Sequence, residues 1–113
     1  MKAVKLFLVA LFATLSVNLF AQSTKTETIK VSGNCGSCKK NIETAAALPG
    51  VAKADWNKST KVLTLTYDPA KVTSDAVQKK VAAAGYDTEK YKGDDKAYQK
   101  LDECCQYDRK KGK

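Results

Sequence analysis

The sequence predicts an α+β domain in which two helices cover one face of a four-stranded antiparallel sheet, followed by a short C-terminal helix. Two observations lead to this prediction. Segments with strand-like and helix-like apolar spacing follow one another in the order strand, helix, strand, strand, helix, strand. Each half also carries a glycine between its helix and the next strand, at Gly50 and Gly85. This order is that of the ferredoxin-like βαββαβ sandwich.

In the first half, residues 26–31 are predicted to form a strand, residues 38–48 a helix and residues 51–57 a second strand. The strands are inferred from alternating inward-facing residues, which are Ile29, Val31, Ala52, Ala54 and Trp56. The helix is inferred from an apolar stripe with the spacing i, i+4, i+7 and i+8, which consists of Cys38, Ile42, Ala45 and Ala46. Pro49 and Gly50 end this helix.

In the second half, residues 61–67 are predicted to form a strand, residues 74–84 a helix and residues 86–91 a weaker fourth strand. A short turn at residues 58–60 joins the second and third strands as a hairpin. The inward residues of the third strand are Leu63, Leu65 and Tyr67, and the helix stripe consists of Val77, Val81 and Ala84. Thr73 or Ser74 is expected to cap the helix.

Residues 1–21 have the pattern of a secretory signal peptide. Lys2 and Lys5 precede a mostly apolar run that ends at Ala21, after which cleavage is expected. The alternative, a membrane anchor, is disfavoured because the run is short for a bilayer and contains polar residues. The pattern predicts a bacterial periplasmic or secreted protein without a stable membrane anchor after cleavage.

The remaining chain divides into a domain over residues 22–92 and an extension over residues 93–113 that ends in a basic tail. Within the extension, residues 96–108 are predicted to form a helix. Tyr98, Leu101 and Cys105 lie on one stripe at i, i+3 and i+7. The extension is therefore expected to dock on the domain through that stripe.

The chain is basic, with a formal net charge of +8 at pH 7, which falls to +6 when Lys2 and Lys5 are removed with the signal peptide. The lysines are scattered and are not clustered with aromatic residues. This distribution is typical of a solvated surface and argues against a nucleic-acid interface.

The segment from Asn34 to Lys40 carries a CxxC motif, with thiols at Cys35 and Cys38. It lies between the first predicted strand and the first predicted helix. The N–H groups at a helix N-terminus favour thiolate over thiol, and the neighbouring Lys39 adds positive charge. Thiolates select soft ions, and two thiolates alone favour Cu(I) or Hg(II), because Zn(II) takes four ligands. The chain has no histidine, so any metal site must use sulfur, carboxylate, phenol or backbone ligands.

Cys104 and Cys105 form a second, adjacent pair in the extension. If the extension folds back, one or both thiols complete a site with three or four sulfurs, which widens the choice to Zn(II) or Cd(II). The alternatives are a disulfide to the CxxC motif and a separate second metal site. The sequence leaves these three interpretations open, since exported cysteines usually pair.

A CxxC loop that leads into the first helix of a βαββαβ domain resembles the heavy-metal-associated domain family, which includes copper chaperones and the periplasmic mercury-binding protein. The resemblance covers residues 24–91. It implies that Cys35 and Cys38 bind a soft ion, Cu(I) first and Hg(II), Zn(II) or Cd(II) after it. It also implies that the ion is passed to a partner, such as a metal exporter or a periplasmic acceptor protein.

The chain departs from the family pattern at one position of the metal loop. Family members commonly carry methionine two residues before the first cysteine, where this chain has Gly33. That difference bears on the rigidity of the loop and on the preference for copper. Tyr86 stands where bacterial copper chaperones carry a tyrosine that shields the thiolates, and its other interpretation is ordinary half-buried packing.

Two other functions share these residues. CxxC at a helix N-terminus also suits a thiol–disulfide oxidoreductase, although the predicted strand order is not that of thioredoxin. A pure interaction module on the same fold is the third interpretation. The carboxylates, such as Glu27, Glu43 and Asp55, are scattered and form no catalytic constellation, so the protein is not expected to be an enzyme.

Overall fold

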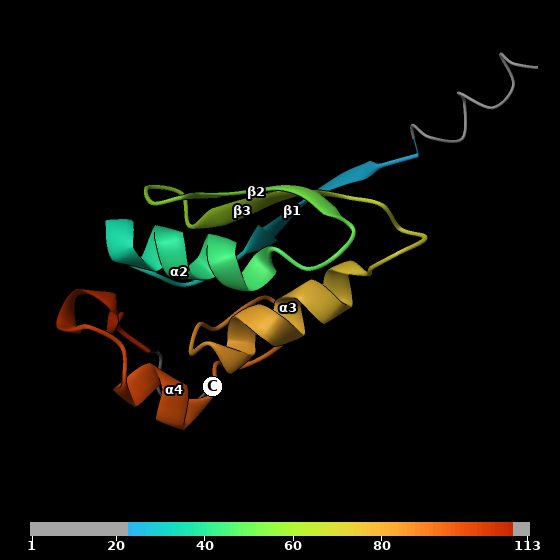
Figure 1. Cartoon of the computed structure of the whole chain (residues 1–113). Helices are drawn as coiled ribbons and strands as arrows, with labels where there is room; N and C mark the ends of the chain where they lie inside the picture. The colour runs from blue at the N-terminus through green and yellow to red at the C-terminus, as the bar shows by residue number, and fades with distance from the viewer. Residues whose placement is uncertain (1–22, 110–113) are drawn as a thin grey trace, which may run out of the picture.

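The computed structural model describes residues 23–109, which form a small sheet with two helices on one face and a C-terminal extension packed beside them (Figure 1). The antiparallel sheet has the order β1-β3-β2. Its strands are β1 (Lys25–Lys30), β2 (Val51–Asn57) and β3 (Val62–Tyr67). The two helices that cover it are α2 (Gly36–Ala46) and α3 (Ser74–Ala83). Among residues 23–109, no helix has the length and apolar character needed to cross a bilayer.

The core lies between the sheet and the two helices and contains most of the inward residues that the spacing predicted. The fully buried members include Ile42 from α2, Leu63 and Leu65 from β3, and Val77 and Val81 from α3. Thr73 caps α3, as expected, because its hydroxyl accepts a hydrogen bond from the backbone N–H of Ala76 at 3.0 Å. Burial of these apolar side chains between the helices and the sheet holds the two layers together.

The prediction for β2 was wrong at Ala52, which is exposed. The register between β2 and β3 shifts between Val51 and Lys53, so one residue of β2 has no opposite partner. Such a bulge interrupts the alternation of side chains along the strand. Alternation resumes beyond it, with Ala54 half-buried and Trp56 buried.

The fourth strand predicted over residues 86–91 is reduced to one antiparallel bridge between Val31 and Thr88. This bridge lies on the edge of β1 that β3 leaves free, which is where a fourth strand would add. The pairing with β1 does not continue because backbone N–H groups of this segment form hydrogen bonds with other partners. Thr88 N–H donates to the carbonyl of Tyr91 at 2.8 Å, and Lys90 N–H donates to Gln78 of α3 at 3.0 Å. The described sheet therefore has three strands.

The single C-terminal helix predicted over residues 96–108 was also wrong. The chain forms α4 (Asp95–Gln99), a turn, and the short 3-10 helix η1 (Glu103–Cys105). Cys105 and Tyr107 are both buried against the domain. Residues two apart on an α-helix point about 200° away from each other, so a continuous helix cannot bury both. The break before η1 allows both side chains to face the core.

Residues 94–109, called the C-terminal strap below, are fixed to the domain by Tyr107. Its hydroxyl donates to the carbonyl of Gly85 at 2.9 Å and accepts from the N–H of Asp87 at 2.9 Å. The Tyr98 hydroxyl donates to the carbonyl of Tyr107 at 2.6 Å. Gly85 has φ +105°, and a side chain there would lie 2.8 Å from the backbone nitrogen of Tyr98. This glycine therefore allows α4 to pass close over the end of α3.

Tyr107→Phe is expected to lower the free energy of unfolding by about 1–3 kcal/mol, because it leaves the buried Gly85 carbonyl without this donor. Urea denaturation of both proteins measures the difference. Tyr91→Phe is the matched control, since the Tyr91 hydroxyl donates at 2.7 Å to Asp75, whose exposed carboxylate can bind water instead. Equal losses in the two variants would show that the hydroxyl of Tyr107 does not hold the strap.

Candidate metal centre

The CxxC loop connects β1 to α2 and is held at both ends by backbone hydrogen bonds. Ser32 N–H donates to the carbonyl of Asp87 at 2.9 Å. Cys35 is the N-cap residue of α2, and its carbonyl accepts from Lys39 N–H at 3.1 Å. Cys38 is completely buried in the first turn, whereas Cys35 is half-buried. The helix begins at Gly36, earlier than predicted, so both thiols lie at its N-terminal end.

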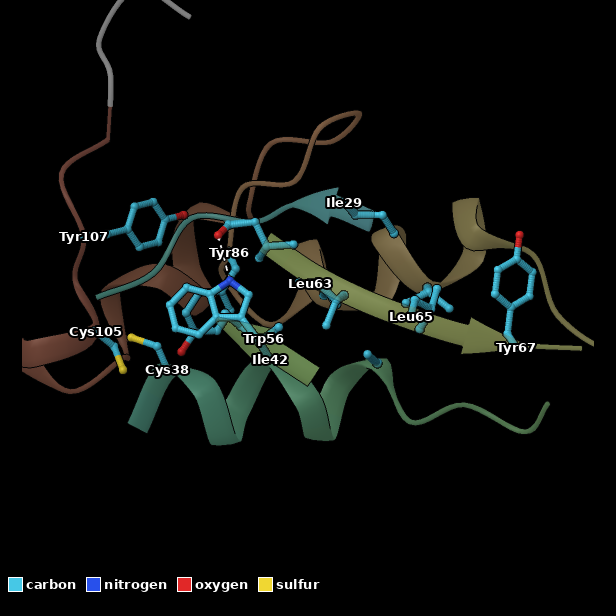
Figure 2. Packing of buried hydrophobic residues seen from close by; sticks show 14 residues of the cluster. Ile29, Cys38, Ile42, Trp56, Leu63, Leu65, Tyr67, Tyr86, Cys105 and Tyr107 are labelled. Atoms are coloured by element: carbon cyan, nitrogen blue, oxygen red, sulfur yellow. Dashed lines mark hydrogen bonds between the residues drawn. The ribbon is translucent and has the colours of Figure 1, made fainter. Parts of the chain in front are cut away.

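Three thiols meet at this end of α2. The Cys35 sulfur lies 3.5 Å from the Cys38 sulfur and 3.6 Å from the Cys105 sulfur. All three sulfurs lie within 4.8 Å of one another. Figure 2 shows Cys105 beside Cys38 at one end of the core, with the rings of Tyr86, Trp56 and Tyr107 around them. Cys104 is exposed and lies outside this group, so the two adjacent cysteines of the strap have different environments.

The surroundings of Cys35 favour its ionised form. The pKa of Cys35 is lowered to about 6, mainly because the Cys104 thiol can donate to its sulfur. Burial opposes this effect, and the backbone N–H and thiol of Cys38 and the Cys105 thiol add to it. Burial raises the pKa of Cys105, while the neighbouring Cys35 raises the pKa of Cys104. Within the cluster, the surroundings of Cys35 therefore favour ionisation, and thiolate is the form that binds metals.

Tyr86 forms part of the wall of the cluster. It is fully buried, and its hydroxyl accepts from the side-chain amide of Asn41 at 2.9 Å. Its ring stacks on that of Tyr107 with centroids 6.1 Å apart. Burial is the main cause that raises the pKa of Tyr86, and the neighbouring Cys105 and Cys38 also raise it. Tyr86 is therefore a neutral phenol.

The Lys39 ammonium does not lie among the three thiols. It pairs with Glu43, lies 2.9 Å from an Asp55 oxygen and donates to the carbonyl of Trp56 at 3.3 Å. The hydrogen bonds that Lys39 donates to Glu43 and then to Asp55 raise its pKa. Its charge is directed toward β2, so it connects α2 to the sheet.

The Trp56 ring packs against the CxxC loop on its core side, a role that sequence reasoning did not assign to it. Its side chain is 1% exposed, and its indole N–H donates to the carbonyl of Val31 at 3.0 Å. A side-chain carbon at Gly33 would lie 2.9 Å from the indole ring and 3.3 Å from the Cys38 side chain. The ring therefore occupies the space under the loop, which leaves room only for glycine at the position where methionine is common.

The comparisons with known proteins agree with this geometry. The heavy-metal-associated domain profile matches residues 28–87, more than half of the chain. A zinc-transporting ATPase from Synechocystis sp. is 44% identical over 64 residues, which are 55% of this chain and 9% of the ATPase. The chain thus spans a small part of that relative's length.

Solved structures with the same fold include small proteins of the domain's own size. The CopZ metallochaperone is 32% identical, with a TM-score of 0.55 over 57% of this chain and 98% of the other. Oxidised MerP from Ralstonia metallidurans CH34 is also 32% identical, with a TM-score of 0.55 over 58% and 94% of the two chains. On the matched profile and this shared ferredoxin-like fold, the chain belongs to the heavy-metal-associated domain family.

Proposed function

We propose that this protein binds one soft metal ion between the thiolates of Cys35 and Cys38 and passes it to another protein. The observation that supports this most strongly is the separation of 3.5 Å between the two sulfurs at the N-terminal end of α2, within a domain of a metal-binding family. The N-terminal end of a helix stabilises the negative charge of the thiolates. Cys35 is half-buried and can reach an incoming ion, whereas Cys38 is buried and fixed.

Cu(I) is the ion we propose first, with Hg(II), Zn(II) and Cd(II) after it. Thiolate donors select all four over hard ions, and the low coordination that Cu(I) accepts suits a small site. Relatives support both copper and zinc as cargo. One is the N-terminal domain of a potential copper-translocating ATPase from Bacillus subtilis, 28% identical and solved in the Cu(I)-loaded state, and another is a zinc-transporting ATPase. The bound ion is cargo, and no catalytic role is proposed for the protein.

Transfer to a partner fits the place of the site at the edge of the domain. A ligand exchange needs one accessible thiolate that an acceptor thiol can approach, and Cys35 meets this need. The net positive charge of the chain favours an acidic acceptor, such as a metal exporter or a periplasmic metal-binding protein. A bacterial periplasmic or secreted location follows from the signal peptide predicted at residues 1–21, which lies outside the described residues.

The proposal is tested by loading the reduced, purified protein with Cu(I), and in parallel with Hg(II), Zn(II) and Cd(II), in the presence of a competing chelator and without oxygen. We expect one ion per chain and a fall in the number of reactive thiols. The same protein with all thiols alkylated is the control and is expected to bind nothing. If the reduced protein binds none of the four ions, metal binding is excluded, and thiol–disulfide exchange at Cys35 and Cys38 becomes the better explanation of the motif.

A further inference from the structure

We propose that Cys105 is the third ligand of the ion, so that the site has three sulfurs and is completed by the C-terminal strap. This inference rests on the proposed function, because it concerns the same ion. The strap lies outside residues 28–87, the part of the chain that matches the family profile. The third ligand is therefore a feature of this chain beyond the matched domain.

The distances among the three sulfurs suit one ion at their centre. A thiolate sulfur lies about 2.3 Å from a bound zinc ion, and three such sulfurs around one ion are about 4.0 Å apart. Here two of the sulfur pairs are separated by 3.5 Å and 3.6 Å, and no pair exceeds 4.8 Å. Small side-chain adjustments are enough to reach the bound geometry, because the backbone already brings the sulfurs together.

Residues before and after Cys105 in the sequence hold the strap in place. Before it, Tyr98 lies edge-on against Tyr107, with ring centroids 5.0 Å apart. After it, Arg109 binds Asp87 at 3.3 Å and the carbonyl of Gly93 at 2.8 Å. The Arg109 guanidinium also covers the Tyr98 ring at 4.6 Å. The η1 segment that carries Cys105 is consequently held against the N-terminal end of α2 (Figure 1).

This anchoring distinguishes a ligand from a chance neighbour. Cys105 has no exposed surface, and its sulfur faces the two sulfurs of the CxxC motif. A site assembled before the ion arrives loses little conformational entropy on binding, which favours tight retention. Cys104, one residue earlier, is exposed and belongs to no such group. It has the same side chain as Cys105, so it provides the control for the number of sulfur ligands.

A third thiolate changes which ions the site accepts. Two sulfurs suit the low coordination of Cu(I) or Hg(II), whereas Zn(II) and Cd(II) require more donors. Three thiolates and one water satisfy such an ion. A disulfide between Cys105 and Cys35 would use the same proximity but leave only Cys38 free within the cluster. Convergence of all three sulfurs on one point favours the metal site.

X-ray absorption spectroscopy on the Cu(I)- or Cd(II)-loaded reduced protein tests this directly. We expect three sulfur neighbours in the wild type and two in Cys105→Ser. Competition with a chelator is expected to show a loss of affinity of more than about 100-fold in Cys105→Ser, since even removing a group that only orients a ligand costs 10–100-fold. Cys104→Ser is expected to keep three sulfurs and to lose less affinity than Cys105→Ser, since its thiol lies outside the group of three but can donate to Cys35.

Two sulfur neighbours in the wild type, or equal affinity in Cys105→Ser, would overturn the third ligand and leave the proposed function standing. An equal loss in Cys104→Ser would overturn it as well. Failure of the wild type to bind any of these ions would instead reject the proposed function. Thermal unfolding of metal-free Cys105→Ser and Cys105→Ala is compared with that of the wild type. A variant that unfolds at the wild-type temperature has lost the ligand and not the fold.

Discussion

Replacing both Cys35 and Cys38 with serine is expected to abolish binding of soft ions, and Cys38→Ser alone to weaken Cu(I) binding by more than about 100-fold. Serine offers a hard oxygen donor that soft ions reject. The fold should survive, because the serine oxygen can still accept the hydrogen bond that Asn34 N–H donates to the Cys38 sulfur at 3.3 Å. Competition with a chelator measures the affinity, and circular dichroism monitors the fold.

Ser37→Ala is the matched control, since Ser37 lies between the two thiols and is exposed. Its affinity should equal that of the wild type. The comparison with Cys105→Ser is also informative, because each single variant leaves two of the three clustered thiols in place. Wild-type affinity in the double variant of Cys35 and Cys38 would move the site away from the CxxC loop and would contradict the proposed function.

The burial of Cys38 and the α+β class could be predicted from the sequence because both depend on local patterns. Apolar spacing fixes which face of α2 is buried, and that face carries Cys38 and Ile42. The stripe of Tyr98, Leu101 and Cys105 correctly indicated which side of the extension packs on the domain. The sequence did not separate Cys104 from Cys105, since one or both of the two thiols could complete the site.

The predictions that were wrong concern features that depend on contacts between distant parts of the chain. The fourth strand is lost because Gln78 of α3 accepts the N–H of Lys90, which a pattern over residues 86–91 does not contain. The helix of the extension is broken because Cys105 and Tyr107 both pack into the core, which a continuous helix does not allow. The position of Trp56 under Gly33 likewise joins β2 to a loop far from it in the sequence. Local spacing carries no information on such pairs.

Trp56→Ala is expected to lower the free energy of unfolding by about 3–5 kcal/mol, a large part of the stability of a small domain. The indole is almost fully buried, and its N–H satisfies the carbonyl of Val31 at 3.0 Å. Its removal leaves a cavity under the CxxC loop and an unpaired carbonyl. Urea denaturation of the metal-free protein measures the loss, and Trp56→Phe is the control that keeps an aromatic ring and is expected to lose less.

The same contact predicts coupling between Trp56 and Gly33. Gly33→Ala alone is expected to destabilise the protein by about 1–3 kcal/mol, because the added carbon would lie 2.9 Å from the indole ring. In a Trp56→Leu background the smaller side chain removes this clash, so the cost of Gly33→Ala should fall toward zero. A double-mutant cycle measures the coupling. Additive effects would show that the ring does not impose glycine at this position and that another constraint on the loop excludes larger residues.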